Sequence, residues 1–460
     1  IDKPSDSPPF LRVLLALIPK KALERWEWMV SPFFDLIHSL ILFGVVLGWT
    51  GHAGVAAMAQ VVYAASPLVV MENSNLTTRS LASLLFTISW LPLMIYRATG
   101  EFHWLVIGLG FLGLLFATHR LALQALFFLC LVWGIWEGSW FFAWVFLGGM
   151  GIAALITGGF YFQVLKGHLT MLNYWRLNIK NRFAHQVRGL PSSDQKDPDA
   201  VFRLYQLIRR APFVAVLGAN PFAVFLIPCW LLHTQGVPPN LPYGLFPILL
   251  FWATALWLIG LTIRWLGPVR FLGEGERYLE YGTFPTAVLS ALWLKQVSTA
   301  PQGTLILGGV AVYLLVAGLL PAILLQRQII VSDIERSVRA PLQRLFDRLN
   351  STSGEVRLLA IPLYMASATV HFTREHVRVV TTDSSYAHLT DLGEFLPVLK
   401  HPLSVLTKRH HLTHLLIGKR YVTPEELGLK GSDLVEASGD FALFSLKRFL
   451  EAKTPSTHSQ

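Results

Sequence analysis

The chain has 460 residues, of which 53% are hydrophobic and only 14% are charged. This composition excludes a water-soluble globular protein, in which about a quarter of the residues are usually charged. The formal net charge of +10 suits a protein that borders anionic lipid. Cys130 and Cys229 both fall inside apolar stretches, so we expect neither a disulfide framework nor a cysteine metal site.

Residues 1–31 are interpreted as a polar N-terminal loop followed by an amphipathic helix. Residues 1–9 are polar and rich in proline, and they contain no secretory signal with a cleavage site. Residues 10–28 place apolar side chains along one side and cluster their basic residues later, which predicts a helix that lies in the membrane interface. Because the chain begins with Ile1 and not Met, an earlier first helix stays an open alternative.

Hydrophobic stretches of membrane-spanning length follow between residues 32 and 326. A spanning helix needs about 20 mostly apolar residues, and about ten stretches approach that length. They are 33–50, 52–71, 79–97, 102–117, 119–136, 139–162, 211–234, 242–267, 282–298 and 303–325. The sequence therefore predicts an all-α polytopic membrane bundle with one long polar connection at 163–210. Lysine and arginine gather in that connection, at 264–277 and after 325, so the positive-inside rule places these segments in the cytoplasm.

The composition becomes charged after residue 326, which marks a second domain at 327–450. Residues 333–349 predict a charged amphipathic helix, and a further helical stretch lies around 387–408. Strand-like runs occupy 356–361, 376–382, 414–417 and 441–446. Strands that alternate with helices predict a small α/β domain. Residues 451–460 predict a disordered tail.

Two polar links between predicted spans are candidates for chemistry. The stretch 66–80 contains Glu72 and Arg79, which are candidates for contact with a substrate headgroup; the alternative is a solvated loop that caps the next helix. His119 and Arg120 form a second charged link. Within a bundle such residues are costly unless they are paired or solvated, so they are candidates for binding a lipid phosphate.

The long polar connection offers two further patterns. Lys166 and His168 belong to a segment that mixes basic and aromatic residues. Nucleic-acid surfaces share this mixture, but beside a membrane it favours contact with anionic lipid, and we expect no nucleic-acid partner. Asp197 and Asp199 form a D-x-D pattern whose carboxylates can share one hard cation; the alternative is an exposed loop. A divalent cation is therefore left open as a cofactor, and no other is expected.

The most unusual string in the chain is GEGERYLEY at 273–281. Its glycines fit no phosphate-loop spacing, because no Lys-Ser/Thr pair follows them. An arginine beside carboxylates can position a sugar or bind a lipid phosphate through two hydrogen bonds, which makes Glu274, Arg277 and Tyr278 candidates for substrate binding. The alternative is an internal salt-bridged turn at the mouth of a helix.

The layout as a whole resembles the GT-C class of polytopic glycosyltransferases. Acidic, proline-rich residues 1–9 lead into a juxtamembrane helix and then SPFFDLIHSLILF at 31–43. A span closes with AASPLVVMENSNLTTRSLASLLF at 64–86, similar to the Ser-Pro-ended third span of these enzymes, and a small α/β domain follows the last span. The resemblance implies an integral membrane glycosyltransferase that moves a sugar from a polyprenyl-phosphate-type donor to an acceptor hydroxyl. The bacterial cytoplasmic membrane is the expected location.

The resemblance also implies roles for individual residues. That class carries its catalytic aspartate on an extracytoplasmic loop after the first helix, which corresponds here to Asp2 or Asp6, acting as general base. Glu72 is a second candidate carboxylate. The cations that would stabilise the departing phosphate are Arg79, Arg277 and Lys166. The class places its loop and its soluble domain outside the cytoplasm, opposite to the charge distribution, so both orientations stay open.

The alternative reading is a non-catalytic membrane component, either a glycan or lipid transporter or a structural subunit of a membrane complex. Carboxylates are sparse within the predicted spans, which favours this alternative. Asp35 and His38 are the one acid–histidine pair that falls inside a span. Membrane lipids are expected partners in either case, with a lipid-linked sugar donor in the first and complex subunits in the second.

We expect Asp2→Asn or Asp6→Asn to abolish sugar transfer while leaving the fold intact, because the amide cannot accept the proton of the acceptor hydroxyl. The measurement is product formation by purified variants whose elution profile in detergent matches that of the unchanged protein. Full activity in both variants would remove these aspartates as the base.

Overall fold

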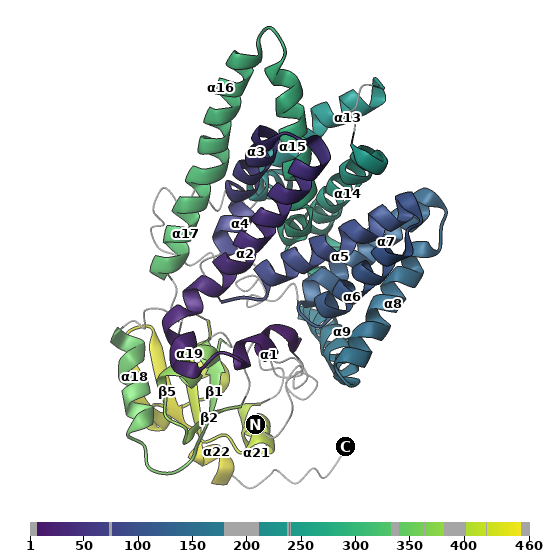
Figure 1. The fold of residues 1–460 in the computed structure, drawn as a ribbon. Coiled ribbons are helices and arrows are strands. Elements are labelled where there is room, and N and C mark those ends of the chain that lie inside the picture. Colours follow the sequence, from purple (N-terminus) through teal and green to yellow (C-terminus); the bar gives the residue numbers. More distant parts are fainter. Residues whose placement is uncertain are drawn as a thin grey trace. The chain divides into compact units, whose positions relative to one another are not determined.

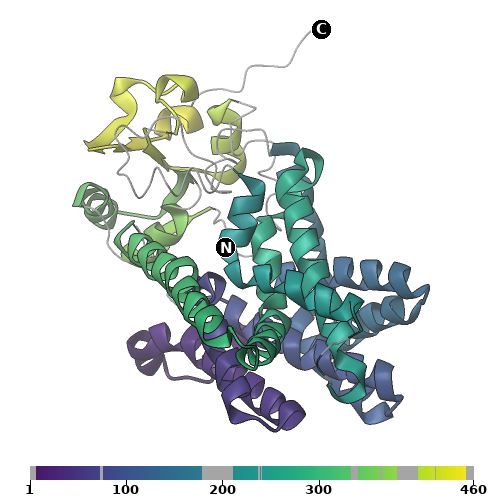
Figure 2. The same cartoon turned by 90° about the horizontal axis from the view of Figure 1, so that it is seen from above.

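The computed structural model describes residues 7–72, 76–178, 211–236, 239, 241–332, 340–362, 365–380, 402–419 and 421–451. The chain divides into two compact units. The helical unit comprises Pro8–Val164 and Asp199–Ile330, and the α/β unit comprises Ile1–Ser7, Leu165–Pro198 and Val331–Gln460. The ribbon views show helices throughout the first unit and a sheet with flanking helices in the second (Figures 1 and 2).

The N-terminal part of the helical unit contains α1 (Phe10–Ala16) and α2 (Lys20–Thr50). α2 is 31 residues long and continues through Pro32, so the span expected over 33–50 is the second part of a longer helix. The pattern expected to form one interfacial helix over 10–28 is divided between α1 and the start of α2. Proline is tolerated inside a membrane helix when neighbouring groups satisfy the carbonyl that it leaves unpaired.

Three helices follow α2 in the chain. They are α3 (Ala53–Ala64), α4 (Pro67–Glu72) and α5 (Arg79–Thr99). α2 packs against both α3 and α5. α5 is the central helix of the unit, because 78% of its apolar window is buried in protein, against 17% to 50% for the other helices of spanning length. Any polar residue on α5 must therefore find its partner inside the bundle.

Further helices complete the bundle around α5 (Figure 1). α6 (Phe102–Phe116) packs against α5 and α8 (Phe141–Ile156), and α7 (Arg120–Glu137) packs against α8 and α14 (Leu245–Trp265). α9 (Phe160–Asn178) crosses from the helical unit into residues of the α/β unit. α16 (Gly303–Tyr313), the π-helical turn η5 (Leu314–Leu319) and α17 (Leu320–Ser332) follow each other at the end of the unit.

One helix pair is broken sharply. α12 (Pro212–Ala219) is followed by η1 (Pro221–Phe225) and α13 (Leu226–Thr234), and the two parts meet at an angle of 96°. The break lies at Asn220, whose φ of −136° and ψ of 84° are non-helical. Pro221 explains the break, because the residue before a proline is pushed out of the helical region.

The segment between the spans predicted at 242–267 and 282–298 is folded into the protein. α14, which follows η2 (Pro242–Gly244), leads into the 3-10 helices η3 (Gly267–Leu272) and η4 (Gly275–Gly282), and then into α15 (Thr283–Ser298). η4 is largely buried. A Cβ on Gly260 of α14 would lie 2.6 Å from the Gly275 carbonyl oxygen, and a Cβ on Gly275 would overlap with the Gly260 carbonyl oxygen. The two backbones thus touch at a pair of glycines, which brings η4 into the bundle.

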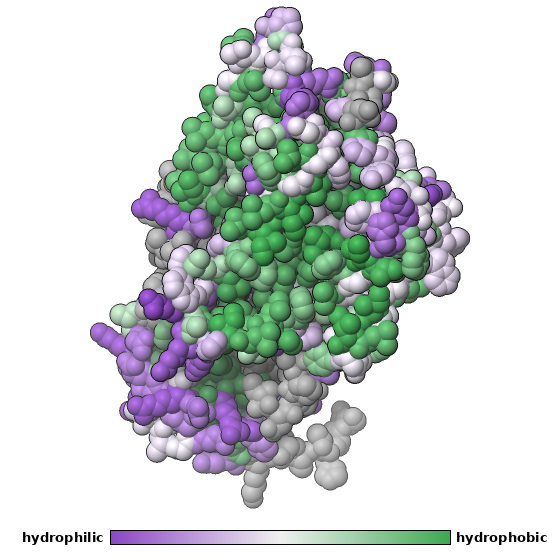
Figure 3. All heavy atoms as spheres, viewed as in Figure 1, coloured by the Kyte–Doolittle hydropathy of each residue, from purple (hydrophilic) through white to green (hydrophobic). Residues whose placement is uncertain are grey.

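The protein is an integral membrane protein. Every predicted interval contains helix, but in the described part of the chain five helices, or six with the bent pair, are long and apolar enough to cross a membrane. α3, α6 and α8 are apolar but shorter than a single crossing requires. Hydrophobic residues cover most of the visible surface of the helical unit, whereas hydrophilic residues cover much of the α/β unit (Figure 3).

The α/β unit contains a five-stranded mixed sheet in the order β2-β1-β3-β5-β4. β1 pairs in parallel with β2 and β3, while β5 pairs antiparallel with β3 and β4. The strands are β1 (Val356–Ile361), β2 (Val377–Val379), β3 (His414–Gly418), β4 (Leu434–Ser438) and β5 (Phe441–Ser445). The short helices are α18 (Ala340–Asn350), α19 (Met365–Phe372), α21 (Leu403–His410), η6 (Glu425–Leu427), η7 (Gly431–Asp433) and α22 (Lys447–Glu451).

The four expected strands are confirmed, and β4 was missed. The buried strands β1, β3 and β5 are mostly apolar, which the sequence shows directly. β4 reads LVEAS and is partly exposed along its length, so no hydrophobic run marks it. A strand at the edge of a sheet needs less apolar surface than a central one.

We expect Gly275→Ala to lower the free energy of unfolding by about 1–3 kcal/mol, because its methyl group would separate η4 from α14. Gly282→Ala is the matched control in the same segment, since the nearest atoms to its Cβ lie at 3.6 Å, an ordinary contact distance. Unfolding of both variants in one detergent measures the difference. Equal stability of the two would show that the glycine contact does not hold η4.

Candidate functional site

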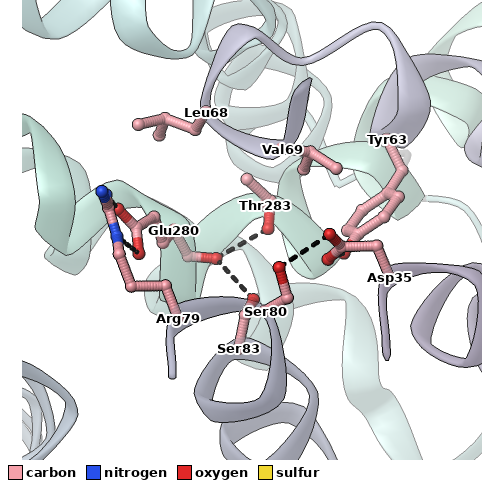
Figure 4. A pocket seen from close by; sticks show the side chains of 9 residues that line it. All are labelled: Asp35, Tyr63, Leu68, Val69, Arg79, Ser80, Ser83, Glu280 and Thr283. Carbon is pink, nitrogen blue, oxygen red and sulfur yellow. Dashed lines mark hydrogen bonds and ion pairs between the residues drawn. The ribbon is translucent and has the colours of Figure 1, made fainter. Parts of the chain in front are cut away.

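The helical unit contains a small, partly open polar pocket with a cavity volume of about 20 Å³. Side chains reach it from α2, α3, α4, α5, η4 and the start of α15 (Figure 4). The lining residues are Asp35, Tyr63, Leu68, Val69, Arg79, Ser80, Ser83, Glu280 and Thr283. Most of them are polar, which is unusual in the interior of a membrane bundle.

An ion pair between Arg79 and Glu280 forms one wall of the pocket. Arg79 Nε donates to Glu280 Oε2 at 3.1 Å, and a second guanidinium nitrogen contacts Glu280 Oε1. The two side chains are 10% and 6% exposed, so water screens their charges little. Arg79 is the first residue of α5 and Glu280 lies near the end of η4, 201 positions later. Two-point contact of this kind fixes both the position and the orientation of the guanidinium.

The backbone of Glu280 is held separately from its side chain. Its carbonyl oxygen accepts a hydrogen bond from Ser83 Oγ at 3.2 Å and another from Thr283 Oγ1 at 2.7 Å (Figure 4). The backbone N–H of Thr283 also bonds this oxygen, so three donors from α5 and the start of α15 hold it. The main chain of η4 is therefore anchored to α5 whether or not the carboxylate holds Arg79.

The opposite wall is a chain of hydrogen bonds that begins at Asp35. Ser80 Oγ donates to Asp35 Oδ2 at 2.8 Å, and Tyr63 donates from its hydroxyl to Asp35 Oδ1 at 3.3 Å. The Tyr63 hydroxyl also lies 2.8 Å from His38 Nδ1, and His38 Nε2 lies 2.9 Å from Thr87 Oγ1. Asp35, noted in the sequence beside His38, is thus joined to it through a tyrosine from another helix.

This arrangement can bind an anion or a polar headgroup. A guanidinium binds a phosphate through two parallel hydrogen bonds. The serine, threonine and tyrosine hydroxyls can pair with sugar hydroxyls. Among the residues that the structure describes, no group of three or more His, Cys, Asp or Glu side chains could hold a metal ion.

Arg79 is the one predicted substrate-binding residue that lines this pocket with its side chain described. His119 contacts η4 next to the pocket residue Glu280. Its Nδ1 lies 2.9 Å from the hydroxyl of Tyr281, which follows Glu280 in the sequence. Tyr278 donates its hydroxyl to Gln124 Oε1 at 2.7 Å. His119 and Tyr278 therefore connect α7 to η4 and do not line the pocket.

Other predicted residues lie elsewhere in the helical unit. Arg277 Nε pairs with Glu274 within η4 and the loop before it, with 43% of the arginine side chain exposed. This ion pair is compatible with the internal salt-bridged turn that was left open as an alternative, and substrate binding by these residues stays a prediction. Arg120 is the first residue of α7. None of these three side chains lines the pocket.

The remaining predictions cannot be placed in this pocket. Lys166 is exposed and His168 is buried on α9, in residues that belong to the α/β unit. Glu72 is the last residue of α4, and its side chain lies outside the described part of the chain. The carboxylates proposed as base or as metal ligands, Asp2, Asp6, Asp197 and Asp199, also lie outside the described residues.

The sequence did not single out Glu280, Ser83 or Thr283. Glu280 belongs to the string around Arg277, which contains two other glutamates, and no local pattern distinguishes the one that faces the bundle. Two serines on α5, Ser80 and Ser83, occur one turn apart just after Arg79. Residues three apart on a helix share a face, so this spacing was the available signal.

The fold has counterparts among solved structures. The chain matches no protein-family model and no curated protein sequence. It is similar to the crystal structure of ArnT from Cupriavidus metallidurans in the apo state, with a TM-score of 0.54 and 13% identity over 98% of this chain and 90% of that one. The chain has a GT-C-like fold. The layout expected from the resemblance to that class is thereby confirmed for the fold.

A second ArnT structure is similar over nearly the same range. It has a TM-score of 0.51 and 14% identity, covering 96% of this chain and 88% of that one, and it is bound to undecaprenyl phosphate. The sequence predicted a helical membrane bundle with a small C-terminal α/β domain, and this fold is confirmed. The similar ArnT structure was determined with undecaprenyl phosphate bound.

We expect the Arg79–Glu280 pair to be strongly non-additive in stability. Arg79→Gln or Glu280→Gln alone would leave a buried charge without this partner, at a cost of about 3–5 kcal/mol, and the double variant should lose less than the sum. Arg97 and Glu137 form the matched control, an ion pair 48% and 24% exposed, whose coupling should stay below about 1 kcal/mol. Unfolding in one detergent measures both cycles. Additive losses at Arg79 and Glu280 would contradict a tight buried pair.

Proposed function

We propose that this chain is an integral membrane glycosyltransferase that moves a sugar from a polyprenyl-phosphate-type donor to an acceptor hydroxyl. The observation that carries the proposal is a buried arginine in a polar pocket of the bundle, in a chain with a GT-C-like fold. The ArnT structure bound to undecaprenyl phosphate supports a lipid-linked donor. The bacterial cytoplasmic membrane is the proposed location.

The chemistry requires a cation where the leaving group departs. The acceptor hydroxyl attacks the anomeric carbon, a new carbon–oxygen bond forms, and the bond from that carbon to the phosphate oxygen breaks. Negative charge then develops on the departing polyprenyl phosphate, and a preorganised guanidinium stabilises it more strongly in a pocket shielded from water. Arg79 is our candidate for this role because it is buried and lines the pocket.

The hydroxyl must also lose its proton to a base. Asp2, Asp6 and Glu72 keep the candidate role that the resemblance implies, and Asp35 adds a carboxylate that lines the pocket. Donor binding stays a prediction for seven other residues: Lys166, His168, His119, Arg120, Glu274, Arg277 and Tyr278. A divalent cation at Asp197 and Asp199 also stays a prediction.

One observation favours the non-catalytic alternative. The charges of Arg79 and Glu280 neutralise each other, and the surrounding hydroxyls are hydrogen-bonded within the protein. A network of this kind can also fasten helices together in a structural subunit or a transporter. Binding of a lipid phosphate distinguishes the two, because a purely structural network has no need of one.

We expect the protein in nanodiscs to bind undecaprenyl phosphate, and the double variant Arg79→Gln, Glu280→Gln to lose at least about tenfold in affinity. The double variant removes both charges of this ion pair together, so we expect the fold to be kept. Native mass spectrometry with undecaprenol as the uncharged control measures the phosphate-specific part.

The double variant Arg97→Gln, Glu137→Gln removes an exposed ion pair outside the pocket and should bind as the unchanged protein does. Undiminished binding after loss of Arg79 and Glu280 would exclude the pocket as the phosphate site. No binding by the unchanged protein would favour the non-catalytic alternative.

A further inference from the structure

We infer that Glu280 is a built-in occupant of the phosphate subsite, whose carboxylate holds Arg79 until the phosphate of a lipid-linked donor displaces it. This inference rests on the proposed function and adds a regulatory step to it. Both side chains line the pocket, so the exchange takes place within one site (Figure 4).

The contact geometry makes the two anions competitors. The Glu280 carboxylate occupies the edge of the Arg79 guanidinium formed by Nε and a terminal nitrogen, through both of its oxygens. A phosphate group uses two oxygens on the same kind of edge. A second anion held beside the carboxylate in this buried place would be repelled by it, since charges interact strongly where water is scarce. Tight binding of the phosphate therefore requires the carboxylate to leave the guanidinium.

The local backbone allows the side chain to move alone. The carbonyl oxygen of Glu280 stays bonded to Ser83 and Thr283, which anchors η4 on α5 and α15. Rotation about the side-chain bonds of Glu280 can release Arg79 without breaking either hydrogen bond. The exchange therefore does not depend on breaking the backbone contacts that hold η4.

The pair also explains how a charged site is kept inside the bundle. An isolated guanidinium at 10% exposure would be costly, and Glu280 neutralises it. The same contact lowers the affinity for the donor, because binding must first break a hydrogen-bonded ion pair. The measured affinity then reflects how much more strongly Arg79 binds the phosphate than the Glu280 carboxylate. A neutral side chain at position 280 should raise this affinity.

The test compares Glu280→Gln with the unchanged protein in nanodiscs, using undecaprenyl phosphate as the probe. Glutamine has nearly the same shape but no charge, so we expect affinity to rise by about tenfold. Glu280→Gln should melt at a lower temperature without lipid, and undecaprenyl phosphate should raise its melting temperature more than that of the unchanged protein, because the phosphate replaces the missing anion. Glu137→Gln, which breaks the exposed pair with Arg97, is the control and should change neither quantity.

The outcomes separate this inference from the proposed function. If Glu280→Gln binds no more tightly, or more weakly, while the Arg79→Gln, Glu280→Gln variant still loses binding, Glu280 positions Arg79 and is not displaced, and the inference is overturned. If the double variant keeps its affinity, the phosphate lies elsewhere and the pocket assignment itself fails. Undecaprenol should bind the unchanged protein and Glu280→Gln equally; a gain with undecaprenol would mean a general loosening of the bundle, which also overturns the inference.

Discussion

The cost of placing charge and polar backbone inside an apolar bundle is the constraint on which this site depends. Arg79 and Glu280 lie about 200 positions apart in sequence, yet each is buried against the other. Either charge alone would be expensive at this depth, so α5 and η4 must lie together for both to be tolerated. In the pocket, the buried charges of Arg79 and Glu280 neutralise each other, and the guanidinium is also a group that can bind a phosphate.

The path of the chain between α14 and α15 makes the pairing possible. The 3-10 segment η4 presents the Glu280 carbonyl to the Ser83 and Thr283 hydroxyls and the Glu280 carboxylate to Arg79. η4 enters the bundle because Gly260 and Gly275 let two backbones touch. Irregular backbone at membrane depth is tolerated when protein groups satisfy it, and such segments commonly line cavities.

The likeness to ArnT at 13% identity shows how little of this architecture depends on particular residues. Apolar helices in lipid need only hydrophobic side chains of suitable size, so their sequences diverge while their arrangement stays recognisable. Differences in sequence between the two proteins should reveal most about function at the pocket. Here the pocket combines a guanidinium, two carboxylates and several hydroxyls, and one of the carboxylates is paired with the guanidinium.

The sequence by itself determined which part of the chain lies in lipid and which part lies in water, and which secondary structure each part forms. Long apolar runs predicted the helical bundle. After residue 326, strand-like runs that alternate with helical stretches predicted the α/β domain and four of its five strands, because a strand buried on both faces is apolar at successive positions. It also pointed to Arg79 and to the string that contains Glu280. Only the tertiary structure decided that η4 is buried, that Glu280 and not Glu274 meets Arg79, and that Tyr63 joins Asp35 to His38. These contacts link helices far apart in sequence, and local patterns carry no information about which distant partner neutralises a buried charge.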